Sequence, residues 1–305
     1  MYDILRERIN RRTFIERTTL TVAGIVMTPA VLAGCGGSTS TSSENLLDQA
    51  RKAGYIRVGF ANEAPYGYAD SSGKLTGEAP TVAGAIMKKL GVPSLQGVLT
   101  EFGALIPGLM ANRFDMIAAG MFITPQRCNA ILFSNPDYIA TEALAVKAGN
   151  PHHLTDYQSL AANSQVVLGA ESGAVEGPWM RQSGVPSSKI QLFPDGPTGI
   201  QALASGRVDA FALTAISLAY LIKTGGYRNL EVTPPFIPVI GGQKKLAAGG
   251  YGFRKSEASL VTQFNQQLAA MQQSGELLKL VEPFGFTGVT VTGAHQVTAA
   301  QLCKA

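Results

Sequence analysis

Arg127 stands between two apolar runs in a chain that is only 15% charged. Residues 121–138 read MFITPQRCNAILFSNPDY, so the arginine follows a Thr-Pro pair and precedes Cys128. A guanidinium offers two parallel N–H donors that match the two oxygens of a carboxylate, and lysine does not reproduce that geometry. Such an arginine can anchor an anionic ligand, or it can be a surface arginine on a turn. The rest of the chain decides between these two hypotheses.

Other residues that could do chemistry do not form a recognisable pattern. The sequence shows no Ser-His-Asp order, no cluster with metal-ligand spacing and no phosphate-binding glycine loop. Its three histidines are His152, His153 and His295, and the adjacent pair is expected in solvent. We therefore predict no catalytic residue, no metal and no cofactor.

The length and composition indicate a globular protein with room for two domains. A chain of 305 residues can bury two cores, and 46% of it is hydrophobic. The formal net charge is +4, and five arginines against three acidic residues place two of these charges in residues 1–34. The small remainder predicts no nucleic-acid partner.

The N-terminus reads as a targeting segment and not as part of the fold. A charged part with the Arg11-Arg12 pair precedes LTVAGIVMTPAVLAG, which is too short and too interrupted for a membrane span. It ends in VLAGC at Cys35, which resembles the lipobox of bacterial lipoproteins. We predict a signal peptide with a lipobox over residues 1–35 and lipidation of Cys35. An ordinary signal peptide with an incidental cysteine is the alternative, and twin-arginine and Sec export both stay open.

Residues 36–50 begin with GGSTSTSSEN, a Gly- and Ser-rich run typical of a flexible tether. A lipid on Cys35, a tether and a globular body predict an exported protein. It would be anchored at the outer face of the cytoplasmic membrane or held in the periplasm. Stable anchoring needs more than one acyl chain, which lipoprotein processing adds.

Cys128 and Cys303 are the remaining cysteines. Export would place them in an oxidising compartment, where two thiols usually pair. We predict a disulfide bond between them, with two free buried thiols as the alternative. The chain-entropy model gives roughly 5 kcal/mol of stabilisation for so long a loop.

Strands alternate with helices through most of the body, which predicts an α/β fold with parallel sheets. Residues 55–63 (YIRVGFANE) read as a strand, and residues 79–91 read as a helix with Gly91 at its end. The pattern starts afresh near residue 150 with SQVVLGA, GPTGIQALASG and RVDAFAL. The tail EASLVTQFNQQLAAMQQSGELLKLVEPFG reads as helices without a strand, and we expect it to pack on the first unit.

These units predict two lobes. Residues 51–146 and 246–305 would form lobe 1, and residues 147–245 would form lobe 2. The chain would cross between the lobes near residues 145–150 and 243–250, which makes a hinged clamshell with a cleft. Open α/β sheets bind ligands beyond the carboxyl ends of their strands, so both lobes would direct those ends at the cleft. We expect a monomer.

The stretch FGALIPGLMANRFDMIAAGMFITPQRCNAILFSNPDY resembles the family 3 extracellular solute-binding proteins, the receptors of polar amino-acid ABC importers. The resemblance runs from IRVGFANEAPYGYADSSGKLTGEAP through SGRVDAFAL to YGFRKSEASL and SGELLKLVEPFGF, nearly the whole body. It implies a type II periplasmic-binding-protein clamshell. Within the family, NEAPY, GMFITPQRC, FPDG and the terminal QLC are similar to the binding proteins of ectoine and hydroxyectoine importers.

The resemblance implies roles for single residues. In this family the arginine of the TPxR motif grips the ligand carboxylate, and by position that arginine is Arg127. Amino-acid receptors hold the ligand's α-ammonium with an aspartate where this chain has Thr214. Phe122, two residues past Gly120, stands where a serine often lines the site, and Val175 stands where a threonine usually follows Gly-Ser. A free α-amino group would therefore lack its dedicated partner.

A ligand for such a pocket should carry a carboxylate and a delocalised cation. The family lines its cleft at the positions of Tyr66, Phe102 and Phe122, whose ring faces can attract a cation. Glu63 and Glu176 are the expected acceptors for ring N–H groups. Ectoine, a cyclic amidinium carboxylate, meets these demands. Core packing of the aromatic rings and a solvated rim position for the glutamates are the alternatives.

The sequence thus predicts a non-enzymatic receptor that closes on a zwitterionic compatible solute and docks on the permease subunits of an ABC importer. One alternative is a receptor of the same family for a polar amino acid or a betaine. A less favoured one is a cyclic-acid dehydratase with Glu63 or Glu176 as general acid. Trp179 is interpreted as packing of lobe 2. The sequence does not determine the affinity, the permease or the preference between ectoine and hydroxyectoine.

Overall fold

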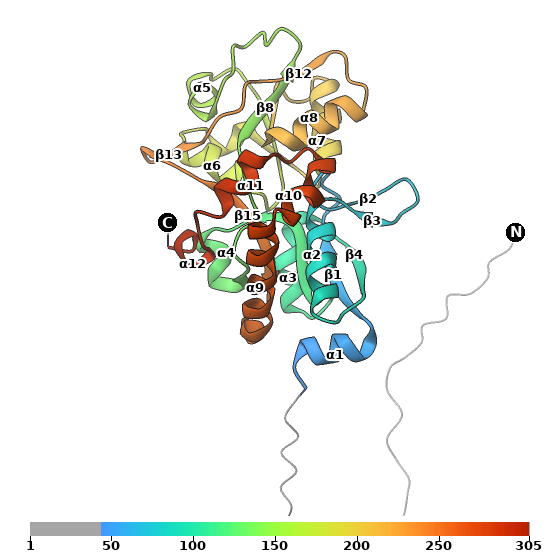
Figure 1. The fold of residues 1–305 in the computed structure, drawn as a ribbon. Helices are drawn as coiled ribbons and strands as arrows, with labels where there is room; N and C mark the ends of the chain where they lie inside the picture. Colours follow the sequence, from blue (N-terminus) through green and yellow to red (C-terminus); the bar gives the residue numbers. More distant parts are fainter. Residues whose placement is uncertain (1–43, 305) are drawn as a thin grey trace, which may run out of the picture. The chain divides into compact units, whose positions relative to one another are not determined.

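The computed structural model describes residues 44–304, drawn in colour in Figure 1. The predicted signal peptide, the lipidation site at Cys35 and the first part of the predicted tether lie outside the described residues. Within residues 44–304, no helix has the length and apolar character needed to cross a membrane. Two main sheets organise the described chain.

The described part begins with a helix where the sequence analysis expects a tether. Helix α1 spans Leu46–Ala53, so the prediction of a flexible segment over residues 36–50 is wrong for its last five positions. Two apolar residues on one face of this helix, Leu47 and Ala50, are buried in the core of the first lobe. Burial of this amphipathic face stabilises the helix.

The first sheet contains β1 (Tyr55–Phe60), β4 (Ser94–Leu99), β5 (Met116–Phe122), β6 (Leu132–Phe133), β7 (Tyr138–Ala140) and β15 (Ala247–Phe253). The strand order is β4-β1-β5-β15-β6, and β7 also pairs with β15. Strands β1, β4 and β5 are parallel, whereas β15 runs antiparallel to β5, β6 and β7. Strand β15 is buried along its whole length, as expected of a strand covered on both faces.

The helices of the first lobe come from both ends of the described chain. They are α2 (Glu78–Lys89), α3 (Leu105–Met110), α4 (Pro125–Ala130), α9 (Ala258–Ser274), α10 (Glu276–Val281), α11 (Gly288–Ala294) and α12 (Ala299–Leu302). Short 3-10 turns lie at η1 (Phe102–Ala104), η3 (Lys255–Glu257) and η4 (Glu282–Phe284), and β2 (Tyr68–Ala69) pairs with β3 (Leu75–Thr76). Helices α9 and α10 contact α2, and α11 contacts β7, so the C-terminal tail packs on the first lobe.

The second sheet contains β8 (Glu142–Lys147), β9 (Leu168–Glu171), β10 (Ile190–Phe193), β11 (Ala210–Thr214) and β12 (Leu230–Val232). The order is β10-β9-β11-β8-β12. Its helices are α5 (Tyr157–Ala162), α6 (Glu176–Gln182), α7 (Gly196–Ala204) and α8 (Ala215–Thr224), with a 3-10 turn η2 (Ser187–Lys189). Figure 1 shows this sheet and its helices as a second lobe, apart from the lobe that holds β1 and β15.

The first crossing between the lobes is shorter and earlier than predicted. Strand β7 ends at Ala140 in the first sheet and β8 begins at Glu142 in the second, so the chain crosses at Thr141. The predicted crossing near residues 145–150 is wrong, and residues 142–146 belong to the second sheet. The local pattern of EALAVK predicts a strand, but the sheet it joins is set by pairing with β11 and β12.

The return crossing carries a small hairpin, formed by β13 (Val239–Ile240) and β14 (Gln243–Lys244). The chain re-enters the first sheet at Ala247, within the predicted range 243–250. Both strands next to the crossings are antiparallel to a neighbour, β8 to β11 and β15 to β5. The two sheets are therefore mixed, and the prediction of parallel sheets is wrong for these strands.

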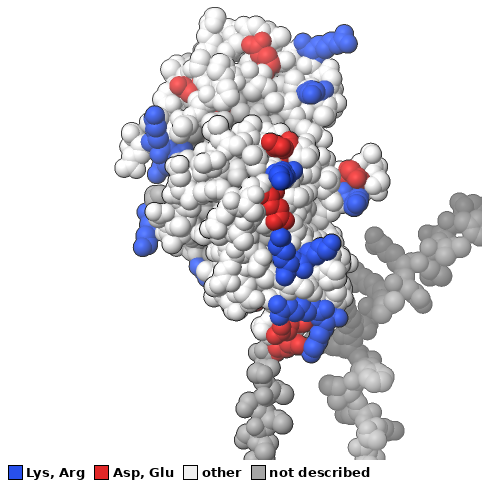
Figure 2. All heavy atoms as spheres, viewed as in Figure 1, with Lys and Arg blue, Asp and Glu red and all other residues white. Residues whose placement is uncertain are grey.

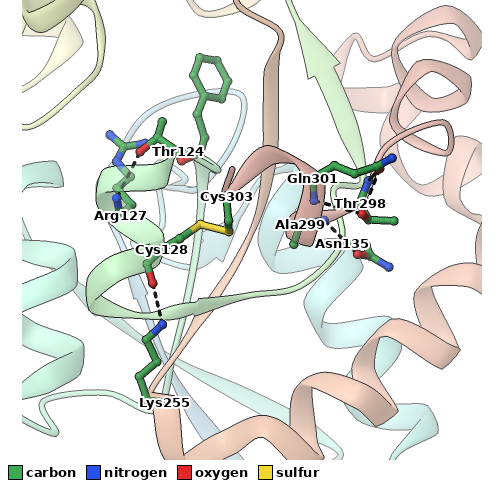
Figure 3. The surroundings of a disulfide bond; sticks show 10 residues. Thr124, Arg127, Cys128, Asn135, Lys255, Thr298, Ala299, Gln301 and Cys303 are labelled. Atoms are coloured by element: carbon green, nitrogen blue, oxygen red, sulfur yellow. Dashed lines mark hydrogen bonds between the residues drawn. A yellow bond between two sulfur atoms is a disulfide. The ribbon is translucent and has the colours of Figure 1, made fainter. Parts of the chain in front are cut away.

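The predicted disulfide bond joins Cys128 on α4 to Cys303 just after α12, with the two Cα atoms 5.7 Å apart. Figure 3 shows Cys128 pointing at Cys303, with Arg127 on the same helix. The Lys255 ammonium donates to the Cys128 carbonyl at 2.6 Å, and the Asn135 side chain accepts from the Ala299 N–H at 3.1 Å. The C-terminal end of the chain is thus held against the segment that carries the arginine.

Charged side chains are sparse on the face shown in Figure 2. Charges of both signs are present, and most of that face is uncharged. Lys89 and Glu276 form an ion pair, with 3.0 Å between the nitrogen and the oxygen.

Candidate ligand-binding site

A small cavity lies between the two lobes, beyond the carboxyl ends of β1, β5, β9 and β11. Its lining residues are Glu63, Phe102, Gly120, Phe122, Arg127, Ala174, Val175, Glu176, Leu213 and Thr214. The structure thus gathers every predicted ligand-contacting residue except Tyr66 around one cavity. The cavity volume is about 20 Å3, which is room for little more than one water molecule.

Arg127 comes from α4, whose first turn is fixed by Pro125 and by the Thr124 hydroxyl, an acceptor for the Arg127 N–H at 3.3 Å. The guanidinium is buried. Its Nη1 donates to the Phe122 carbonyl at 2.8 Å, and its Nη2 donates to the Gly173 carbonyl of the second lobe at 3.0 Å. The surface hypothesis for this arginine is therefore wrong.

Burial lowers the pKa of Arg127 to about 10, against the raising effect of Glu176 and other nearby groups. The side chain still carries its charge at neutral pH. It lies over the Phe102 ring, with 5.3 Å between the guanidinium carbon and the ring centroid. A cation held at this depth, with donors that point at backbone carbonyls only, is placed to bind a carboxylate.

Aromatic rings from both lobes surround the arginine. Phe122 stacks against Trp179 of α6, with 6.4 Å between the ring centroids and planes 21° apart. Trp179 packs against the core of lobe 2, as predicted, and also against the core of the first lobe. No local signal in the sequence places this ring across the cleft.

Tyr66 is fully buried behind Gly120 and does not line the cavity. Its ring packs against Tyr138 and Phe286 at centroid distances of 5.0 and 5.5 Å. Gly120 adopts a φ of +64°, and a Cβ atom there would lie 2.4 Å from the Tyr66 ring. A glycine is therefore required at this position both by its backbone conformation and by the tyrosine behind it.

Two predicted carboxylates face Arg127 in the cavity, one from each lobe. Glu63 lies in the loop after β1 and accepts a hydrogen bond from the Ser217 hydroxyl of the second lobe at 3.0 Å. Burial and the charge of Glu176 raise the pKa of Glu63 to about 8. Burial raises the pKa of Glu176, the first residue of α6, to about 7, against the lowering effects of its own N–H and of Arg127. Neither glutamate lies at a solvated rim.

Two further buried glutamates lie behind these, and the sequence analysis did not find them. Glu142 begins β8 and Glu171 ends β9, and both are at most 1% exposed. Burial raises the pKa of each well above the usual carboxylate range. Both carboxylate oxygens of Glu171, Oε1 of Glu142 and Oε2 of Glu176 have no hydrogen-bond partner. A strand-end glutamate carries no signal of its own, because only the fold buries it.

Thr214 ends β11 and begins the turn into α8. Its hydroxyl oxygen accepts from the Ser217 N–H at 3.4 Å, which caps the helix. The side chain is buried and uncharged, so it supplies no anion for an ammonium group. Negative charge on the second-lobe side of the cavity comes from Glu176 instead.

The lobes are in contact around the cavity. Gly103 and Gly173 approach so closely that a Cβ atom on Gly173 would lie 2.3 Å from the Gly103 Cα. Tyr68 of the first lobe and Tyr220 of the second have ring centroids 5.8 Å apart. A ligand larger than a few atoms therefore enters only when the lobes move apart.

A larger cavity of about 990 Å3 opens on the other side of Arg127. Its walls include Ile106, Trp179, Arg181, Lys245, Leu246 and Val297. It shares Arg127, Ala174 and Val175 with the small cavity, but Glu63 and Glu176 do not line it. Within the described residues, no group of His, Cys, Asp or Glu side chains could hold a metal ion.

Comparisons with known proteins cover nearly the whole described chain. The family model for bacterial extracellular solute-binding proteins, family 3, matches residues 56–287. A protein of Sinorhizobium fredii named as a probable amino-acid ABC transporter periplasmic-binding protein, y4tE, is 35% identical over 261 residues. That alignment covers 85% of this chain and 86% of y4tE.

Two solved structures are similar as well. The structure of EhuB in complex with hydroxyectoine matches with a TM-score of 0.78 and 36% identity, over 85% of this chain and 98% of that chain. An ancestral amino acid-binding protein, AncCDT-1, is described as a precursor of cyclohexadienyl dehydratase. It matches with a TM-score of 0.69 and 27% identity, over 79% of this chain and 99% of that chain. The predicted type II periplasmic-binding-protein clamshell is confirmed.

Proposed function

Because the chain belongs to the bacterial extracellular solute-binding proteins of family 3, we propose that its cleft binds a small cyclic zwitterion of the ectoine or hydroxyectoine type. Its family and its relatives make it a substrate-binding receptor of an ABC importer for amino-acid-like ligands. The finer proposal concerns the ligand, and it rests on the chemistry of the cavity.

The observation that carries the proposal is the arrangement of Arg127 opposite Glu63 and Glu176 between aromatic rings. A carboxylate on the ligand would take the fork of N–H donors on Arg127. A delocalised ring cation would lie against the faces of Phe102 and Phe122, where a cation gains about 0.5–2 kcal/mol. Its ring N–H groups would donate to the two glutamates. Ectoine carries these groups within one small ring.

The pKa values of the two glutamates support a cationic ligand. Both are raised because the carboxylates are buried with too little positive charge nearby. A ligand cation would supply that charge and would lower both values again. A neutral ligand would leave two carboxylates buried and poorly compensated, which is costly.

The similarity to EhuB adds support from outside the chain, because that structure holds hydroxyectoine. A cavity of about 20 Å3 is too small for a ring of the ectoine type as the lobes now stand, so binding requires the lobes to move apart. Contacts from both lobes, Arg127 with Phe122 on one side and Glu176 on the other, would give the closed form its higher affinity. We also propose that Cys35 is lipidated, on the basis of the VLAGC sequence.

A polar α-amino acid is the competing ligand. It would use Arg127 in the same way, but its ammonium would meet Thr214, which has no charge. Glu176 could take that role in a different orientation of the ligand. An enzyme on this fold is the other alternative, since a carboxyl group with a pKa of about 8 suits a general acid.

Calorimetric titration of the purified protein with ectoine tests the proposal, with glycine betaine, arginine and glutamine in parallel. We expect heat with ectoine alone, and about 2.7 kcal/mol of added stability at a ligand concentration one hundred times Kd. Ectoine recovered unchanged after incubation speaks for a receptor. Binding of glutamine or arginine without ectoine would refute the ligand proposal, and conversion of the ligand would favour the enzyme.

A further inference from the structure

Glu142 lies where the two crossing segments meet. It is the first residue of β8, directly after the crossing at Thr141. Its N–H donates to the Phe236 carbonyl at 2.9 Å, and the Phe236 N–H donates to the Glu142 carbonyl at 2.8 Å. The backbone of Glu142 is therefore fixed by the return segment on one side and by β11 on the other, where it pairs with Thr214.

The Glu142 side chain is completely buried and has one neutral donor. The Tyr157 hydroxyl donates to its Oε2 at 3.1 Å. The Tyr157 ring is held in place by an edge-to-face contact with Phe236, with 5.1 Å between centroids. The other oxygen, Oε1, has no partner, although a buried acceptor without a partner is rare and costly.

Glu176 has the other unpartnered carboxylate oxygen. Its Oε2 is buried without a partner, and Glu142 is one of the groups that lower the pKa of Glu176. The Glu142 backbone pairs with Thr214, which lines the same cavity as Glu176. Two ionised carboxylates cannot satisfy each other, because both only accept. A single proton between them supplies the missing donor for both oxygens.

The surroundings decide which group holds that proton. Burial and the charge of Glu176 raise the pKa of Glu142 well above its usual range, and only the Tyr157 hydroxyl opposes them. Glu176 has the Arg127 guanidinium and its own N–H, which favour its ionised form. Glu142 is therefore the acid and Glu176 the anion.

We propose that Glu142 is a positioning residue that, as a neutral carboxylic acid, donates its O–H to Glu176 and holds that carboxylate ionised and aimed at the cationic group of the ligand. This inference rests on the proposed function for the identity of the cation. The Tyr157 hydroxyl donates to Oε2 of Glu142, so the Glu142 O–H is available to donate to Glu176. Glu142 itself does not line the cavity.

The groups around Glu142 bear on its protonation from every side. The Tyr157 hydroxyl of α5 contacts Glu142, and the charges of Glu176 in α6 and Glu63 in the first lobe raise its pKa. Glu142 in turn raises the pKa of Tyr66. Arg127 acts on Glu142 through Glu176. Glu63 and Glu176 both have a pKa near neutrality, so the experiment must separate their titration from that of Glu142.

Two substitutions of nearly equal size separate the donor from the packing. Glu142→Gln keeps an acceptor for Tyr157 and an N–H donor for Glu176, whereas Glu142→Met fills the space without a donor. Ectoine titrations from pH 6 to pH 9 are the readout. We expect Glu142→Gln to bind within about threefold of wild type at each pH.

We expect Glu142→Met to bind about tenfold more weakly at pH 6, because a hydrogen bond to a charged group is lost. The deficit should shrink as pH rises, since Glu176 without its donor ionises at higher pH. Equal pH profiles for wild type and Glu142→Met would overturn the proposal. An equal loss in both variants would also overturn it, because packing or charge would then explain the effect.

A ligand-free measurement keeps the test independent of the proposed function and of the Met variant's folding. The side-chain carboxyl carbons of 13C-labelled glutamate are followed by NMR from pH 5 to pH 9, and the Glu142 signal is assigned as the one missing in Glu142→Gln. We expect it to stay at the shift of a neutral acid across this range. A Glu142 signal that moves to the ionised shift below pH 7 would overturn the proposal. Absence of ectoine binding in wild type would refute the proposed ligand alone.

Discussion

Two buried groups of charges in this protein are built in opposite ways. At the edge of the first sheet, Asp115 accepts from Nε and Nη2 of Arg57 at 2.9 and 2.8 Å. Arg254 reaches the same carboxylate at 3.4 Å. Burial alone would raise the pKa of Asp115, but the hydrogen bonds from Arg57 outweigh it and the pKa is lowered.

In the cleft of the described chain, by contrast, Arg127 is the only arginine among four buried glutamates. Glu63 and Glu176 line the small cavity with it, and Glu142 and Glu171 are buried nearby. The Arg127 guanidinium donates to backbone carbonyls and not to the carboxylates. Burial raises the pKa of all four glutamates. One carboxylate has two arginines in the first cluster, and four carboxylates have one in the second.

The first cluster contributes to the stability of the fold, whereas the second contains carboxylates that the chain itself leaves unsatisfied. A buried carboxylate with a bidentate arginine is satisfied within the chain, so it contributes to stability when its partner is present. Buried carboxylates with free oxygens reduce stability on their own. Such an arrangement is typical of a site that another molecule completes.

Arg127→Met should reduce ligand affinity more than any other change described. It removes the only Lys or Arg side chain among the residues of the described chain that line the small cavity. We expect ectoine affinity to fall by at least about 30-fold, because truncation of one partner in a buried charged hydrogen bond costs about 2–5 kcal/mol. Calorimetric titration measures it. Arg113→Met is the matched control, since that arginine is exposed in the same lobe, and it should bind like wild type. Retained affinity in Arg127→Met would remove the arginine from the ligand site.

Asp115→Asn should destabilise the protein by about 2–3 kcal/mol, because two arginines lose their anion. Urea unfolding at pH 7 measures the loss. The lowered pKa of Asp115 fixes the sign with pH: its contribution is present above the unfolded pKa and is lost as pH falls through the folded pKa. The difference between variant and wild type should therefore shrink in acid. A constant difference down to pH 2 would contradict the ion-pair explanation.

Glu63→Gln should change stability with the opposite sign. The folded pKa of Glu63, about 8, lies above the unfolded value. Wild type therefore loses stability as the pH rises from 4.5 to 8, because the unfolded chain releases this proton while the folded protein keeps it. The glutamine cannot ionise and still accepts from Ser217. We expect equal stability near pH 4.5 and an advantage of the variant that grows by up to about 1.4 kcal/mol for each pH unit toward pH 8. Ectoine affinity should fall in the same variant.

Unfolding curves for Glu63→Gln and wild type at several pH values provide the measurement. If the variant is less stable than wild type at pH 8, then Glu63 behaves like Asp115 and the contrast between the two clusters fails.

Local sequence patterns predicted several helices and strands correctly. The helix predicted over residues 79–91 is α2 (Glu78–Lys89), with Gly91 just beyond it in the left-handed region at φ +87°. The strand predicted from residue 55 is β1, and the paired cysteines are joined. In each case the deciding information lies in neighbouring residues or, for the cysteines, in the chemistry of the residue type.

The family resemblance predicted residues of the candidate site that local sequence patterns could not identify. It pointed to Arg127, Phe122 and Glu176, which line one cavity in the structure. It did not predict that Tyr66 lies behind Gly120, since that depends on how closely the two segments pack. It also gave no indication of Glu142 and Glu171, whose neighbours in space come from distant parts of the chain.

By itself, the sequence determined the helices and strands, the alternating α/β pattern and the arginine in its apolar setting. These follow from periodicity and from the residue types themselves. The tertiary structure alone decided that β8 belongs to the second sheet, that Trp179 packs against Phe122 across the cleft and that Glu142 and Glu171 are buried. Strand pairing and burial join residues far apart along the chain, and a carboxylate's pKa depends on whatever surrounds it in space.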